Sequence, residues 1–97
     1  MKSVMIVFNQ ANTERVEYML DMLEVRGFTF FEHVQGRGSV DGDPRRGTHA
    51  WPEMNSAMLC VVQDEKVEPL LEAVQKLDLR NKEVGVKAFT WNIEQMV

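Results

Sequence analysis

The fold of this chain is decided by residues 57–74, which read AMLCVVQDEKVEPLLEAV. Residues 57–62 form a continuous apolar run of the kind that makes a buried strand. Asp64 can then cap a helix, after which apolar residues recur at i, i+3, i+4 and i+7, namely Val67, Leu70, Leu71 and Val74. The apolar period therefore changes from that of a strand to that of a helix across a short turn.

The first third of the chain has the same order. Residues 4–8 are a short, β-branched apolar run, and Asn12 is placed to cap a helix whose apolar stripe consists of Val16, Met19, Leu20 and Leu23. Gly27 is expected to end that helix, because glycine accepts the left-handed conformation that follows a helix end. Residues 28–35 are rich in aromatic side chains and predict a second strand, and residues 85–93 predict a fourth.

These elements follow one another as β-α-β, a long loop, and again β-α-β, within a length of 97 residues that is typical of one domain, residues 1–97. Two such halves with right-handed crossovers form an α+β, ferredoxin-like βαββαβ sandwich, a four-stranded antiparallel sheet with both helices on one face. The second face of this sheet then has no cover from within the chain.

Alternation along the strands places large side chains on both faces of the predicted sheet. In the first strand, Val4, Ile6 and Phe8 are expected on one face, and Met5 and Val7 on the other. In the second strand, Phe28, Phe30 and Val34 are expected opposite Thr29, Phe31, His33 and Gln35. In the fourth strand, Val86, Ala88, Thr90 and Asn92 are expected opposite Lys87, Phe89, Trp91 and Ile93. An apolar sheet face without cover favours association, most economically with copies of the same chain.

Composition narrows the class of protein. Eleven Lys and Arg against fifteen Asp and Glu give a net charge of −4, which argues against a nucleic-acid partner. The single cysteine, Cys60, excludes an internal disulfide and fits a reducing compartment. The apolar run at residues 4–8 is too short for a signal peptide or a membrane span. We therefore expect a cytoplasmic protein without membrane insertion.

Residues 36–53 form the long loop between the second and third strands and read GRGSVDGDPRRGTHAWPE. The segment is either a surface connector or a functional loop. Arg37, between two glycines, is either a solvated arginine in a turn or holds a phosphate or carboxylate together with the neighbouring backbone N–H groups. Arg45, Arg46 and Trp51 are either ordinary loop residues or contacts for a partner protein.

His33, His49 and Cys60 are the candidate metal ligands of this sequence. Their spacing matches no compact zinc pattern, so a strand histidine at a subunit contact, a loop histidine in water and a small buried thiol explain them better than a metal site does. No nucleophile is followed by an adjacent base, and nothing in the sequence demands catalysis. We therefore expect a protein that is not an enzyme and requires no cofactor.

Several stretches, taken together and in order, resemble the PII signal-transduction family, and more closely its shorter PII-like relatives. They are VRGFTFFE at 25–32, GRG at 36–38, VVQDEKVE at 61–68, GVKAF at 85–89 and NIEQMV at 92–97. The resemblance covers almost the whole chain and is weakest in the long loop.

The resemblance implies a homotrimer with ligand sites in the clefts between subunits. It also implies that residues 36–53 are a T-loop that engages a target protein, often a transporter or an enzyme, in response to a small anion such as ATP, ADP or AMP. Carried over by position, the ligand-binding residues are Thr29, Gly36, Arg37, Gly38, Gly85 and Lys87, and Arg45, Arg46 and Trp51 would contact the target.

The segment at 84–87 reads VGVK where the family has two glycines before the lysine, so a ligand other than a nucleotide stays open. The divalent-cation tolerance family has the same trimeric architecture. A metal-binding trimer using His33, His49 or Cys60 is therefore the alternative.

Overall fold

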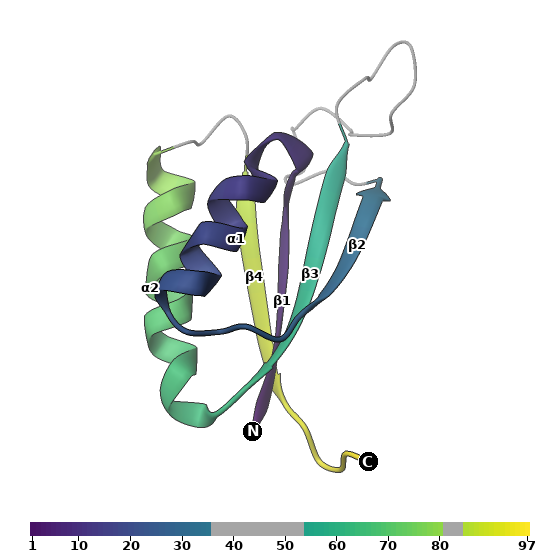
Figure 1. Cartoon of the computed structure of the whole chain (residues 1–97), viewed down its shortest axis with the longest axis vertical. Coiled ribbons are helices and arrows are strands. Elements are labelled where there is room, and N and C mark those ends of the chain that lie inside the picture. Colours follow the sequence, from purple (N-terminus) through teal and green to yellow (C-terminus); the bar gives the residue numbers. More distant parts are fainter. Residues whose placement is uncertain (36–53, 81–84) are drawn as a thin grey trace.

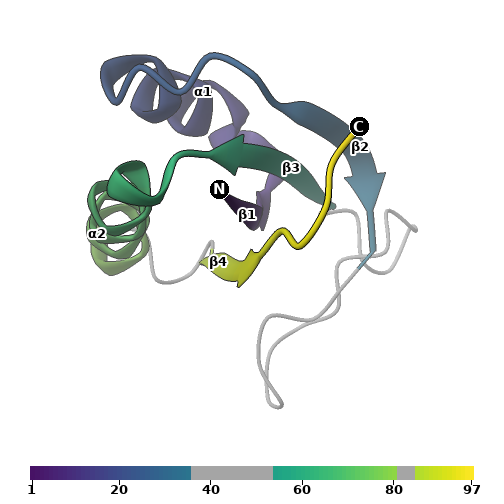
Figure 2. The same cartoon turned by 90° about the horizontal axis from the view of Figure 1, so that it is seen from below.

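A computed structural model describes residues 1–35, 54–80 and 85–97. Its elements are β1 (Lys2–Asn9), the 3-10 helix η1 (Gln10–Asn12), α1 (Thr13–Met22), β2 (Thr29–Val34), β3 (Asn55–Val62), α2 (Asp64–Arg80) and β4 (Val86–Asn92). The strands form one antiparallel sheet in the order β2-β3-β1-β4. Both helices lie on the same face of this sheet (Figures 1 and 2), so the ferredoxin-like arrangement is confirmed.

The core lies between the sheet and the two helices. In the sheet, Ile6 of β1 is the register partner of Met58 on β3, and Val4 is the partner of Cys60. The helices contribute the predicted stripes, of which Val16, Leu20, Val67, Leu70 and Val74 are buried. Burying a side chain of this size stabilises the fold by about 1.5–3 kcal/mol, so the face that carries them is strongly specified.

Helix α1 ends at Met22, well before Gly27, so the prediction that Gly27 ends the helix is wrong. The left-handed residue is instead Glu24, with φ of 58°. The N–H of Val25 donates to the carbonyl of Leu20 at 2.8 Å, and both side chains belong to the buried core. This is a Schellman ending, in which packing of the residue after the turn closes the helix. The burial of Val25 in the core thus places the left-handed conformation at Glu24, although glycine adopts that conformation more readily.

Lys66, in the first turns of α2, supports the same helix end. Its Nζ donates to the carbonyl of Leu23 at 2.8 Å and lies 4.0 Å from the carboxylate of Glu24. Helix α2 itself begins at Asp64, the residue expected to cap it, whose carboxylate is 3.2 Å from the N-terminal ammonium of Met1.

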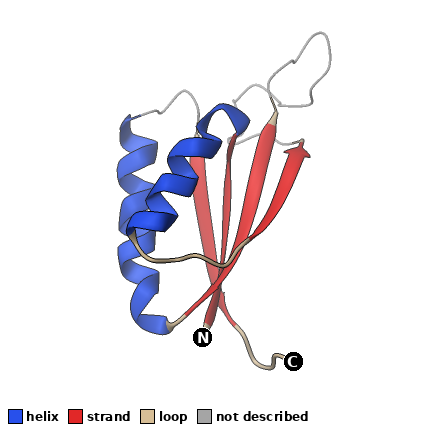
Figure 3. Ribbon diagram, viewed as in Figure 1, coloured by secondary structure: helices blue, strands red, loops and turns tan. Residues whose placement is uncertain are grey.

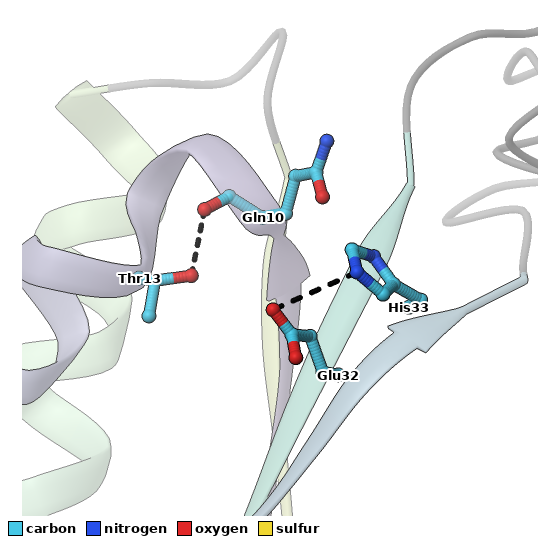
Figure 4. Close-up of polar contacts among 4 residues, drawn as sticks. All are labelled: Gln10, Thr13, Glu32 and His33. Atoms are coloured by element: carbon cyan, nitrogen blue, oxygen red, sulfur yellow. Dashed lines mark hydrogen bonds and ion pairs between the residues drawn. The ribbon is translucent and has the colours of Figure 1, made fainter.

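The start of α1 differs from the prediction that Asn12 caps it. Asn9 provides a cap one turn earlier, because its Oδ1 accepts from the N–H of Ala11 at 2.9 Å and begins η1. Asn12 occupies the cap position of α1 but makes no side-chain capping bond. Thr13 Oγ1 donates to the carbonyl of Gln10 at 2.6 Å across the junction of the two helices (Figure 4).

Strand β2 contains a bulge that changes the predicted faces. Phe31 pairs with Ala57, whereas Val34 pairs with Asn55, so three steps on β2 match two on β3. The extra residue is accommodated at His33, whose φ is 58°. Val34 therefore falls on the face of Phe31, and its predicted position beside Phe28 and Phe30 is wrong.

The predicted alternation of β1 and β4 is confirmed by their register, in which Ile6 faces Ala88 and Met5 faces Phe89. Within the described ranges, neither helix is long and apolar enough to cross a membrane. The long loop at 36–53 lies outside the described residues.

Candidate functional site

One sheet surface carries no helix, as Figures 2 and 3 show, and we call it the open face. Strand register assigns to it Ser3, Met5, Val7, Asn9, Thr29, Phe31, Val34, Asn55, Ala57, Leu59, Val61, Lys87, Phe89 and Trp91. Three aromatic side chains on this face remain widely exposed, Phe31 at 43%, Phe89 at 56% and Trp91 at 48%. An apolar sheet face that is exposed in this way favours association.

The second feature is the edge of the sheet where β1 and β2 end and β3 and β4 begin, which we call the upper rim (Figure 1). Asn9 and Asn55 face each other there in register and are 5% and 4% exposed. Asn12 and Ser56 are also buried, and the Nδ2 of Asn12 and the Oγ of Ser56 have no hydrogen-bond partner among the described residues. Buried polar groups thus gather where the segments 36–53 and 81–84 join the sheet.

Gly85 and Lys87 lie at the start of β4, on the upper rim. Lys87 is exposed and pairs with Val7, which places its side chain on the open face. Gly85 has φ of 62°, a conformation that glycine adopts without strain. An ammonium group therefore stands beside both the rim and the apolar surface.

The backbone donor after Gly85 is already engaged. The N–H of Val86 donates to Oδ1 of Asp78, near the end of α2, at 2.9 Å. This bond spans the segment 81–84 and holds the start of β4 against the helix. Asp78 was not predicted, since a contact between a helix carboxylate and a later backbone N–H leaves no periodic signal in the sequence.

Thr29, another predicted ligand residue, lies far from Lys87 within one chain. It pairs with Leu59 on the edge strand β2, whereas Lys87 is on the opposite edge strand β4. Three strand spacings separate the two edges, about 14 Å. One chain therefore does not bring these two residues together.

Gly36, Arg37 and Gly38 lie outside the described residues, as do Arg45, Arg46 and Trp51, so their predicted roles stay predictions. Strand β2 does lead toward the upper rim, where β4 begins, as expected for an anion site shared by Arg37 and Lys87. The two strand ends are nevertheless on opposite edges of the sheet.

The candidate metal ligands do not form a cluster in the described part of the chain. Cys60 is fully buried in the core, and burial raises the pKa of its thiol above the ordinary value. His33 is on the exposed bulge of β2, with its Nε2 3.6 Å from the carboxylate of Glu32 (Figure 4). His49 lies outside the described residues, and among those described no group of three His, Cys, Asp or Glu residues could hold a metal ion.

The chain is thus an α+β protein with a ferredoxin-like fold, whose sheet has one open apolar face and a lysine at its upper rim. The chain belongs to the nitrogen regulatory protein P-II family, whose family model matches residues 1–97. A search of curated proteins finds no relative of this chain.

Solved structures of PII-like proteins share this fold. One is CPII from Thiomonas intermedia K12 bound to ADP, AMP and bicarbonate, with 22% identity and a TM-score of 0.72 over 92% of this chain and 86% of that chain. CPII bound to ADP, AMP and acetate has 22% identity and a TM-score of 0.71, over 97% and 88%. A PII-like signaling protein from Thermus thermophilus has 21% identity and a TM-score of 0.68, over 95% and 85%.

Proposed function

We propose that this chain is a regulatory rather than a catalytic protein, which binds a small anion between copies of itself and reports it to a partner. The observation that carries the proposal is the position of Lys87, an exposed cation at the rim of a bare apolar sheet face in a P-II family chain. Thr29 lies on the opposite edge of that face, so the association of copies can unite what one chain keeps apart.

The proposed assembly is a homotrimer that forms through the open face. Phe31, Phe89 and Trp91 would leave water on association, which supplies the driving force. Lys87 would then stand at the margin of the interface, where clefts between subunits form. Such clefts are common sites for small ligands.

The proposed ligand is an adenine nucleotide or another small anion. The CPII structures contain ADP, AMP, bicarbonate and acetate, which share phosphate or carboxylate oxygens. Lys87 would contact these oxygens by charge-assisted hydrogen bonds, together with Arg37 and the backbone of Gly36, Gly38 and Gly85. The ligand would be bound as a signal and not as a required cofactor.

We assign the contact with the target protein to the segment 36–53. Arg45, Arg46 and Trp51 have the side chains that dominate protein interfaces, and we assign them to the contact with a target protein such as a transporter or an enzyme. The ligand can act on this contact only if it prefers one conformation of the segment, because equal affinity for two states shifts neither.

Isothermal titration with ADP, AMP, ATP, bicarbonate and 2-oxoglutarate tests the anion site. We expect at least one to bind, and Lys87→Ala to weaken that binding by about tenfold to a hundredfold, because a hydrogen bond to a charged group contributes about 1.5–3 kcal/mol. Lys2→Ala, which removes a lysine at the other end of the sheet, is the matched control and should bind as wild type. Absence of binding by every anion, or unchanged binding by Lys87→Ala, would overturn the assignment.

A further inference from the structure

A groove of about 800 Å³ lies between the outer sides of α1 and α2, and we call it the helix groove. Its apolar lining comes from both helices and consists of Tyr18, Met19, Met22, Leu23, Ala73 and Leu77. The two helices lie side by side on the face of the sheet away from the open face (Figure 2). The groove is therefore on the opposite layer from the proposed assembly surface and stays accessible when that surface is covered.

The exposed apolar residues of the groove follow helical spacing. Tyr18 and Met22 are one turn apart on α1 and are 67% and 66% exposed. Ala73 and Leu77 are one turn apart on α2 and line the other wall. Rows with this spacing on two neighbouring helices leave a channel that accepts the ridge of a third helix.

The charges of the groove oppose those of the chain as a whole. Among the described residues that line it, Arg15, Lys76 and Arg80 stand against one acid, Glu14, which gives these four residues a charge of +2. The whole chain has a net charge of −4, so the remainder carries −6. Arginine, tyrosine and methionine are also the residue types that interfaces favour.

We propose that the helix groove docks an amphipathic helix of a partner protein, one whose apolar stripe is flanked by acidic residues. The apolar stripe would cover Tyr18 and Met22, and the acidic flanks would face Lys76 and Arg80. The proposal goes beyond the regulatory function above, because it uses neither the anion site nor the segment 36–53. It assigns to the helical layer the binding of a helix from a partner protein.

A pair of synthetic peptides tests the predicted charge preference. Each is an 18-residue amphipathic helix with leucines at i, i+3, i+4 and i+7, flanked in one peptide by glutamates and in the other by lysines. Fluorescence anisotropy with labelled peptides should show that wild type binds the acidic peptide at least tenfold more tightly. A protein of net charge −4 repels an acidic peptide in general, so this preference requires a local basic site.

Charge reversal locates the site. The double variant Lys76→Glu, Arg80→Glu should lose at least tenfold in affinity for the acidic peptide. The control Lys2→Glu, Arg26→Glu makes the same change of net charge outside the groove and should retain most of the affinity. Both double variants should keep the anion binding of wild type, so failure here is distinguishable from failure of the proposed function.

Truncation of the apolar wall gives an independent measurement. Tyr18→Ala and Met22→Ala should each weaken the acidic peptide at least fivefold, and both residues are exposed enough for the fold to persist. Met96→Ala, at an exposed methionine outside the groove, should have no effect. Amide shifts in ¹⁵N-labelled protein on adding the peptide should be largest in α1 and α2.

Four results would overturn the proposal. The first is equal affinity for the acidic and basic peptides. The second is binding by the groove variants that matches wild type. The third is amide shifts confined to the open face. The fourth is a change of oligomeric mass in the charge-reversed variant by light scattering, which would make the groove an interface between copies of this chain.

Discussion

Glu24 stands in a left-handed conformation that costs a residue with a Cβ about 1–2 kcal/mol. It is kept there by what surrounds it: the N–H of Val25 donates to the carbonyl of Leu20, and Val25 enters the core. Lys66 satisfies the carbonyl of Leu23. The burial of Val25 and the hydrogen bond to the carbonyl of Leu23 thus compensate for the backbone strain at Glu24.

Replacing Glu24 with glycine should therefore stabilise the protein. Relief of the strain outweighs the lost contact to Lys66, which is an exposed pair at 4.0 Å, and we expect a gain of about 1 kcal/mol. Thermal denaturation should show an increase in Tm of about 4–8 °C for a chain of this size. The matched control is Glu72→Gly, the same change at an exposed site within α2, which should cost about 1 kcal/mol. A lower Tm for Glu24→Gly would contradict the argument.

At the scale of elements, the junction between α2 and β4 depends on one side chain. Asp78 accepts the N–H of Val86 and ties the helix to the start of the strand that carries Lys87. Val86 is itself buried against the core, so the bond and the packing act on the same residue. The position of the rim lysine thus depends on a carboxylate near the helix end.

Asp78→Ala should destabilise the protein by about 1–2 kcal/mol, because the N–H of Val86 loses a charged acceptor. Asp78→Asn keeps an oxygen acceptor and should lose less. Urea denaturation measures both, and an unchanged m-value would show that the effect is on native stability. Glu72→Ala, an exposed carboxylate on the same helix, is the control. Equal midpoints for Asp78→Ala and Glu72→Ala would mean that the bond contributes nothing.

At the scale of the whole molecule, the two layers have different surfaces. The open face carries exposed apolar side chains, whereas the helical layer has a groove whose lining includes three basic side chains. Covering the open face with other copies and leaving the helical layer in solvent gives each surface a separate role. Copies of the chain can accordingly associate through the open face while the helix groove binds a partner.

Light scattering tests the role of the open face. We expect wild type at micromolar concentration to have three times the mass of one chain, and Phe89→Lys or Trp91→Glu to reduce that mass, because a charge in a desolvated interface is costly. Leu79→Glu, at an exposed apolar residue of α2, should leave the assembly intact. Wild type with the mass of a single chain would refute the trimer and the composite anion site with it.

The order of the elements and the two helix stripes could be predicted because they depend on periodicity alone. Val16 and Leu20 lie on one side of a helix wherever that helix packs, and Met5 and Phe89 point away from the core once their strands form. The open face was predictable for the same reason, since β1 and β4 run without interruption.

The site could be predicted only in part. Gly85 and Lys87 lie at the rim as expected, but their distance from Thr29 depends on strand order, which adjacent residues do not encode. The acceptor Asp78 and the facing asparagines Asn9 and Asn55 depend on contacts between residues far apart in the chain. No local pattern indicates them.

The sequence by itself determined the order of the elements, the buried sides of both helices and the existence of an uncovered apolar face, because each follows from the spacing of apolar residues. Only the tertiary structure decided where α1 ends, which asparagine side chain makes the capping bond before it and on which face Val34 lies. At Asn12 a second local cap, that of Asn9, takes over the capping bond. At Gly27 and in β2, by contrast, a local preference competes with long-range packing and pairing. Long-range contacts prevail there because burying Val25 and pairing β2 with β3 stabilise the fold by more than a favourable local conformation.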